Sequence, residues 1–257
     1  MISHENGADA FMFSVSERTL SILQAINEKM ETGHLALYAI VPYAYEYVRL
    51  ATQVGMAGLA KRIAGQIVLS GKPTMALSGL KGLIGMDPVS LLKTYLLYEI
   101  RRTKSSAGKM ANLDSLLLHE VITDMALALD LSWLFQKYID IVSKLGINPG
   151  FQTRNFVYLV DKFRSWDIDF QGISIAAPFN KVGFQMSPSR VECERVLTEV
   201  PESTTIAISI LAAGYLKLPE AASYIRALPN LKGIVAGVSK EHQACETFRF
   251  LKESLQG

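Results

Sequence analysis

The feature of this sequence that most constrains its fold is a repeated alternation between short apolar runs and longer amphipathic segments. Runs such as Gly172–Phe179 and Thr205–Leu211 carry apolar side chains at nearly every position, which is typical of strands covered on both faces. The segments between them have the period of a helix, with apolar residues on one face. This alternation predicts an α/β fold built on a parallel sheet with helices on its outside.

Seven runs qualify as strands, and the last five have the spacing of the fourth to eighth strands of a barrel. We therefore predict one domain over residues 1–257, a TIM-type (β/α)8 barrel, with a doubly wound sheet as the alternative. The first barrel strand has no candidate, so it is absent or replaced by part of Gly55–Gly85. The seven expected strands are Ala8–Val15, Leu35–Pro42, Leu113–His119, Asn148–Thr153, Gly172–Phe179, Thr205–Leu211 and Lys232–Val238.

Helical patterns fill the intervals between these strands. Ser16 is expected to cap a helix that runs to Met30, and Ser187 to cap the helix Pro188–Glu199. The segment Gly55–Gly108, after the third barrel strand, is expected to be a helical insertion that packs over the barrel or against a partner chain. The other expected helices are Tyr45–Val54, Val89–Arg102, Leu131–Leu145, Asn155–Trp166, Pro219–Leu228 and Glu241–Leu255.

Composition narrows the functional classes. With 26 Lys+Arg, 24 Asp+Glu and a net charge of +2, nothing points to nucleic acid or to an anionic membrane. No basic apolar leader opens the chain, and no apolar stretch reaches the roughly 18 residues of a membrane span. Cys193 and Cys245 form no disulfide framework. We expect a soluble cytoplasmic protein that forms a homo-oligomer.

Polar residues at the carboxyl ends of the strands are the candidates for a site, because active sites of such barrels lie there. His119 is the candidate acid, base or hydrogen-bond donor. Lys181 is a candidate Schiff-base lysine, and Tyr43 is a possible partner near the pocket rim. The scattered histidines have no metal-ligand spacing, so we expect no metal. The candidate substrate-binding residues are Arg154, Asn180 and Ser209.

An anion site is expected between the last strand and the last helix. Gly237, Ser239 and Lys240 stand there, and free N–H groups at a helix start, a hydroxyl and an ammonium together suit a phosphate. The competing interpretation is that Ser239 only caps the helix.

The second half of the chain, from about Leu113 to Leu255, resembles the aldo-keto reductases. LDSLLLHEV is similar to their fourth-strand D-L-x-L-x-H segment, GFQTRNF to their G-V-S-N-F strand, ISILAAGYL to their seventh-strand segment, and GIVAGVSKEHQACET to their G-x-S-K ending. This resemblance implies a barrel that binds NADP(H) and reduces carbonyl groups.

By position, His119 matches the family's catalytic histidine, and Thr153 and Asn155 match the residues beside the nicotinamide carboxamide. Ser239 and Lys240 match the pair that holds the 2′-phosphate. The adenine-side glutamate is matched by Glu246.

The first half departs from the family. Met12 stands roughly where the catalytic Asp belongs, and the third strand lacks the catalytic Lys.

Three hypotheses follow. The first is a barrel that binds NADP(H) or another anionic small molecule, with carbonyl chemistry at His119. The second is a barrel enzyme from another class, without nicotinamide, which uses Lys181 or Arg154 on a phosphorylated or carboxylated substrate. If the chain is an enzyme, we expect an oxidoreductase-like or lyase-like TIM barrel. The third is a barrel without catalytic activity that serves as a binding or oligomeric scaffold.

Overall fold

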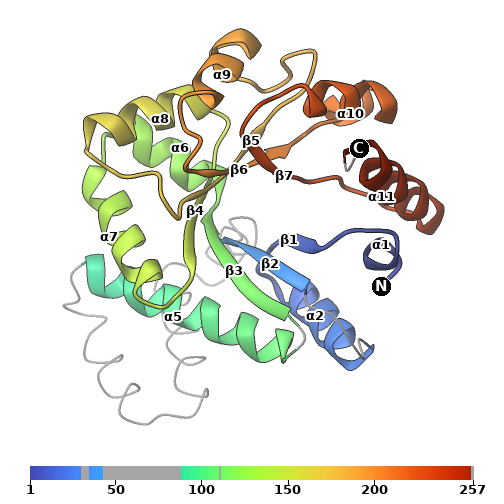
Figure 1. Ribbon diagram of the computed structural model, residues 1–257. Helices are drawn as coiled ribbons and strands as arrows, with labels where there is room; N and C mark the ends of the chain where they lie inside the picture. The colour runs from blue at the N-terminus through green and yellow to red at the C-terminus, as the bar shows by residue number, and fades with distance from the viewer. Residues whose placement is uncertain (30–34, 43–87, 110, 256–257) are drawn as a thin grey trace, which may run out of the picture.

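Seven parallel strands form one continuous, curled sheet at the centre of the molecule (Figure 1). The computed structural model describes residues 1–29, 35–42, 88–109 and 111–255. Within them the strands lie side by side in the order of the sequence, β1-β2-β3-β4-β5-β6-β7. A doubly wound sheet reverses its strand order, so that alternative is wrong. The order is that of a half-barrel, and its two end strands, β1 and β7, are not hydrogen-bonded to each other.

All seven expected strands are present, although several end earlier than the sequence indicates. β6 stops at Ile208 because Ser209 adopts a left-handed backbone, with φ 54°, and turns the chain out of the sheet. The strands are β1 (Ala10–Ser14), β2 (Leu35–Val41), β3 (Ala111–Leu118), β4 (Asn148–Gln152), β5 (Ser174–Pro178), β6 (Thr204–Ile208) and β7 (Leu231–Ile234).

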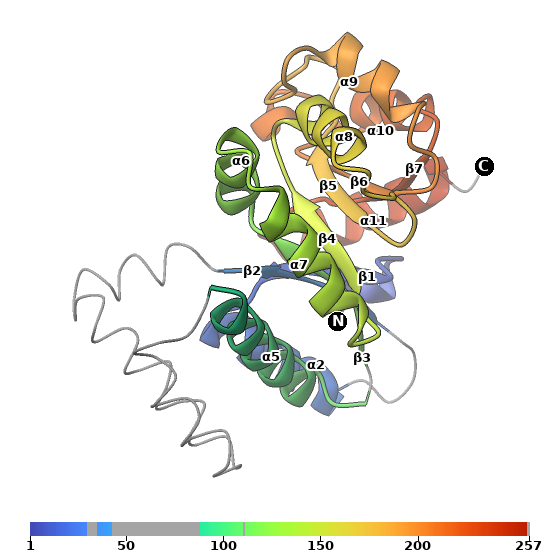
Figure 2. The ribbon, with the colours of Figure 1, turned by 90° about the vertical axis from the view of Figure 1, so that its left-hand side faces the viewer.

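Helices cover the outer face of the sheet, and α2 and α5 lie side by side against its β1–β3 half (Figure 2). No helix in the described ranges combines the length and apolar character needed to cross a membrane. The helices are α1 (Ile2–Glu5), α2 (Glu17–Lys29), α5 (Pro88–Ala107), α6 (Glu120–Ala128), α7 (Ser132–Ser143), α8 (Phe156–Ser165), α9 (Arg190–Leu197), α10 (Leu218–Arg226) and α11 (Glu241–Leu255), with a short 3-10 turn at Ala212–Gly214.

Two helix starts show how local chemistry sets the boundaries. Ser16 accepts a hydrogen bond from the Thr19 N–H at 3.2 Å, as expected of the cap of α2. The cap of α9 is Ser189, whose hydroxyl accepts from the Glu192 N–H, so the assignment to Ser187 was wrong by two residues.

Only the last part of the expected insertion lies in the described residues. There Pro88–Ala107 forms α5, which packs against α2 and β3 and buries Leu96 and Ile100. Tyr45–Val54 and the remainder of Gly55–Gly108 before Pro88 lie outside the described residues.

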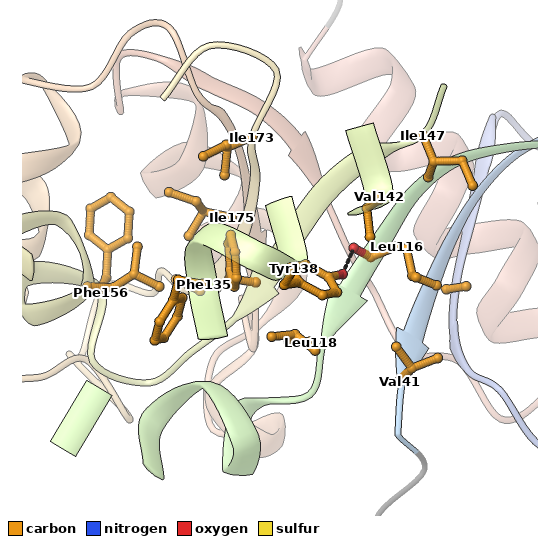
Figure 3. Packing of buried hydrophobic residues seen from close by; sticks show 14 of the residues in the cluster. Val41, Leu116, Leu118, Phe135, Tyr138, Val142, Ile147, Phe156, Ile173 and Ile175 are labelled. Atoms are coloured by element: carbon orange, nitrogen blue, oxygen red, sulfur yellow. Dashed lines mark hydrogen bonds between the residues drawn. The ribbon is translucent and has the colours of Figure 1, made fainter. Parts of the chain in front are cut away.

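The main core lies between the helices and the outer face of the sheet. Its centre is an aromatic group in which Phe151 of β4 meets Phe135 and Tyr138 of α7 and Phe163 of α8, with ring centroids 5.1–5.4 Å apart. The Tyr138 hydroxyl donates to the Leu116 carbonyl oxygen and so ties α7 to β3 (Figure 3). Burying these rings supplies much of the apolar area that stabilises the fold.

The inner face of the curl holds a much smaller apolar cluster. Ile40, Leu117 and Ala176 are its buried members, and Met12 and Tyr38 pack against it. Because side chains alternate between the two faces of a strand, the residues beside outward-facing core residues point into the curl. The inner face is therefore where a ligand can meet side chains without disturbing the main core.

Candidate functional site

The carboxyl ends of the strands meet at one edge of the sheet, as a site there requires. Hydrogen bonds continue the ladder one residue past several strands. The His119 N–H donates to the Val41 carbonyl oxygen at 2.8 Å, and the Thr153 N–H donates to that of Ala176 at 3.0 Å. His119 therefore stands between the ends of β2 and β4.

His119 is held through its Nδ1 atom, and none of the residues described by the structure bonds to its Nε2 atom. Its Nδ1 accepts a hydrogen bond from the Val121 N–H at 3.2 Å, which makes His119 the N-cap of α6. A neutral ring whose Nδ1 accepts carries its proton on Nε2. Leu118 before it points to the outer core, so strand alternation directs His119 to the inner side. His119 thus offers an N–H donor at the inner edge of the sheet.

A network of ion pairs and hydrogen bonds fixes α6 against the loop after β4. Arg154 donates to both carboxylate oxygens of Glu120, at 3.0 and 2.5 Å. Asp124 accepts from the Thr153 hydroxyl at 2.5 Å and from the Arg154 N–H at 3.2 Å. The Thr153 hydroxyl also accepts from the Asn155 N–H. Both Arg154 and Thr153 are therefore engaged within the protein: Arg154 holds Glu120, the residue that follows His119, and Thr153 holds Asp124 on the same helix.

Gln152 and Ser174 place unpartnered polar atoms on the inner face. The Oε1 atom of Gln152 and the Oγ atom of Ser174 are buried, and neither has a hydrogen-bond partner among the described residues. Each residue is flanked by outward-facing core residues, Phe151 for the first, and Ile173 with Ile175 for the second. The register pairs Leu118 with Phe151, so Gln152 is the neighbour of His119 on the next strand.

These three side chains form a polar strip on the inner face, beside the apolar cluster of Ile40, Leu117 and Ala176. An unpartnered buried oxygen is rare in folded proteins and needs a water or a ligand to satisfy it. His119 provides a donor and Gln152 an acceptor on neighbouring strands, about 5 Å apart at the backbone. The strip of His119, Gln152 and Ser174 can therefore bind a polar group that both accepts and donates hydrogen bonds.

Asn180 and Lys181 follow β5, where their side chains have structural partners. The Asn180 amide is fully buried and clamps the loop after β5 by donating to the Phe184 carbonyl oxygen and accepting from the Phe184 N–H. Lys181 Nζ lies 2.6 Å from the Glu220 carboxylate, and both side chains are about half exposed to solvent. A solvated, paired lysine is a weak nucleophile, because a Schiff-base lysine needs desolvation to lose its proton.

The loop after β6 concentrates left-handed backbone. Ser209, Ala212 and Ala213 have φ angles of 54°, 46° and 58°, and Gly214 follows with 89°. Non-glycine residues pay roughly 1–2 kcal/mol for this conformation, and such strain tends to gather at functional sites. Ser209, an expected substrate-binding residue, opens this strained loop at the carboxyl edge.

The start of α11 contains the residues expected to bind an anion. The Ser239 hydroxyl donates to Oε1 of Gln243 at 3.2 Å, and the Ser239 N–H donates to the same oxygen at 3.4 Å. Lys240 is exposed, and it has no ion pair within the described part of the chain. Gly237 and Glu246 are exposed too, the latter on α11. Ser239 is thus engaged locally, while the Lys240 ammonium is free to meet an anion.

The structure gives less support for a site role of the remaining candidate residues. Asn155 precedes α8 but its side chain makes no capping bond, and Tyr43 lies outside the described residues. Within those residues no group of three or more His, Cys, Asp or Glu side chains is arranged to hold a metal ion.

Comparisons with known proteins leave the site to be argued from its own chemistry. No family model matches the chain, and no curated protein or solved structure matches it either.

The sequence analysis gave neither Gln152 nor Ser174 a role in the site. The signal was available in the alternation of β4 and β5. Phe151 is the bulky apolar residue of β4, so Gly150 and Gln152 must share the opposite face. The absence of a partner for the amide oxygen appears only in the folded structure.

Proposed function

We propose that the chain binds a small carbonyl-containing molecule at the inner carboxyl edge of the sheet and acts on it through His119. The observation that carries this proposal is the His119 ring, whose Nδ1 accepts from the Val121 N–H so that Nε2–H is left to donate. A hydrogen bond from Nε2 to a carbonyl oxygen stabilises the negative charge that develops there during addition or reduction. Gln152 beside it accepts a donor group of the same molecule.

The finer proposal is a TIM-type barrel related to the aldo-keto reductases, in which NADP(H) supplies hydride. The free Lys240 at the start of α11 suits a phosphate of such a cofactor or of another anionic ligand. The lysine- or arginine-based alternative gains less support, because Lys181 and Arg154 are both engaged in ion pairs.

The test separates the donor role of His119 from its capping role. His119→Asn keeps a side-chain acceptor that caps α6 well, but its shorter amide does not place an N–H donor at the position of Nε2. His119→Ala removes both, and we expect it to lower the free energy of unfolding by about 1 kcal/mol. The assay is calorimetric titration with NADPH, NADP⁺ and a panel of aldehydes and ketones, followed by absorbance of NADPH at turnover.

We expect the Asn variant to unfold like the unmodified protein while its affinity for the carbonyl ligand falls tenfold or more. A matched Lys240→Ala variant should lose affinity for phosphorylated ligands and keep it for uncharged carbonyl compounds. If the Asn variant binds and turns over as the unmodified protein does, or if the unmodified protein binds none of these compounds, the proposal is wrong.

A further inference from the structure

The gap between the two end strands of the sheet, which we call the seam, is a second and separate feature of the molecule. β1 and β7 run in the same direction at opposite ends of the strand order, and α11 and α1 lie beside the gap between them (Figure 1). A cavity of about 1490 Å³ lies at the seam and extends inside the curl to residues of β2, β3 and β6. It is larger than the roughly 300–1,000 Å³ typical of small-ligand pockets. Its walls include Met12 of β1, Ile234 of β7 and Phe248 of α11.

Within the described residues, both edges of the seam have backbone groups without a partner in the sheet. In a parallel ladder, alternate residues direct their N–H and C=O to opposite neighbours. The Val15 N–H and the Asp9 carbonyl oxygen bond to β2, so Ala10 and Met12 direct theirs to the seam, while the Ser14 carbonyl oxygen already accepts from the Thr19 hydroxyl. The Val235 N–H bonds to Ala207 of β6, so Ile234 of β7 faces the seam in the same way. Only an extended polypeptide can form hydrogen bonds with the backbone groups of both strand edges at once.

The outer side of the seam is already closed by helices. Asn6 donates to the sulfur of Cys245 at 3.6 Å, and Arg249 donates to the Asn6 side-chain oxygen at 3.2 Å, which joins α1 to α11. The seam is therefore a walled slot with two strand edges and not a flat, open sheet edge. Its edge strands have five and four residues, which sets the length of strand that fits.

The charges that line the cavity indicate which kind of strand can bind in the seam. Lys109, Arg226 and Lys232 line the cavity near the amino-terminal ends of the strands, and only Asp9 opposes them among the charged lining residues. All four are exposed, and the described residues provide no ion pair for any of them. A strand entering parallel to β1 and β7 has its amino-terminal end beside these three cations. Carboxylates at that end complement them.

We propose that the seam binds an extended peptide segment of a partner protein as an eighth, parallel strand, with acidic residues at its amino-terminal end followed by β-branched residues. The strand pairs with β1 on one side and β7 on the other, which is β-augmentation at two edges simultaneously. Closing the sheet removes two exposed edges that are otherwise liable to uncontrolled association. This inference does not depend on the role of His119.

The probe is a C-terminally fluorescein-labelled, amino-acetylated octapeptide of two glutamates followed by alternating valine and threonine. Binding to the full chain is measured by fluorescence anisotropy. We expect saturable binding with a dissociation constant below about 100 μM. A peptide that starts with two lysines in place of the glutamates should bind at least tenfold more weakly, and one with proline at alternate positions should not bind.

The charge requirement is tested on the protein with Arg226→Glu/Lys232→Glu. The matched control is Lys137→Glu/Lys217→Glu, which makes the same change in net charge at exposed lysines that do not line the seam. The first variant should bind at least tenfold more weakly, and the control should bind within about twofold of the unmodified protein.

The position is tested by amide hydrogen exchange. On peptide binding, exchange of the Met12 and Ile234 N–H groups should slow at least tenfold, while the Val121 N–H stays unchanged. Absence of peptide binding at about 1 mM, equal weakening by both charge variants, or protection elsewhere with none at Met12 and Ile234 would each overturn the proposal.

Discussion

Replacing Gln152 with methionine is the sharpest test of the polar strip, because stability and binding should move in opposite directions. In the folded chain Oε1 of Gln152 is buried without a partner. A buried acceptor that lost its water costs about 1–3 kcal/mol relative to a satisfied one. The side chain as a whole keeps some exposure, so we take the lower part of that range. Methionine has nearly the same length and no polar atom to desolvate.

Gln152→Met should therefore raise the free energy of unfolding by about 1–2 kcal/mol. For a chain of this size that corresponds to a rise of about 2–4 °C in melting temperature. The measurement is urea denaturation followed by far-ultraviolet circular dichroism, together with a thermal scan. The same variant should bind the carbonyl ligand of the proposed function less tightly, because it lacks the amide.

The control is Gln136→Met on the exposed side of α7, where the change in stability should stay within about 0.5 kcal/mol. Suppose instead that Gln152→Met lowers stability by more than about 1 kcal/mol while the control does not. The amide is then already satisfied in the folded protein, by water or by the chain, and the reasoning that makes Gln152 a ligand-binding residue fails.

Three further predictions concern single positions. Ala213→Gly should raise the free energy of unfolding in urea by about 0.5–1 kcal/mol, because glycine relieves the strain of a φ of 58°. The control, Ala25→Gly in α2, should lower it by about 1 kcal/mol. A decrease for both variants would refute the assigned strain. Burial raises the pKa of the Cys193 thiol to about 11, so at about pH 8 a disulfide reagent should modify Cys245 quickly and Cys193 only as the chain unfolds. The hydrogen bond from Arg164 holds the pKa of the Glu199 carboxyl below its ordinary 4.5, so its stabilisation is present above that pH and is lost as the pH falls through the lowered value. Glu199→Gln should lower the urea midpoint at pH 7, and the difference should shrink as the pH falls below 4.5; a pH-independent difference would contradict the ion pair.

The sequence predicted the sheet well because its strands are covered on both faces. β5, for example, is buried at all five positions. Its short, continuous apolar run between turn residues is typical of a strand covered on both faces. The count of seven strands agrees with the seven in the described residues. The sequence did not predict the walled cavity between β1 and β7. Helix α1 was not predicted, and its contact with α11 joins residues that are far apart in the chain.

The helix α6 was missed for a physical reason. Val121, Met125 and Leu129 recur at helical spacing, but they are 45%, 56% and 64% exposed, so the apolar residues lie on the solvent side as well as on the core side. An amphipathic pattern needs a polar face to be recognised, and here that face is interrupted. His119 was nevertheless identified as a candidate, because a histidine directly after three leucines marks a strand end whatever follows it.

The division of the strands between two faces explains why the inner curl can carry chemistry. The outer face, with Phe151 and its aromatic neighbours packed under α7 and α8, provides most of the buried apolar contact. The inner face has small or polar residues at several positions, among them Gly150, Ser174 and Ala176. Changes there leave the main core in place, since they remove few of its contacts. The inner face can therefore hold a buried polar atom without a partner among the described residues, such as Oε1 of Gln152. The packing of the outer face offsets the unfavourable free energy of burying that atom.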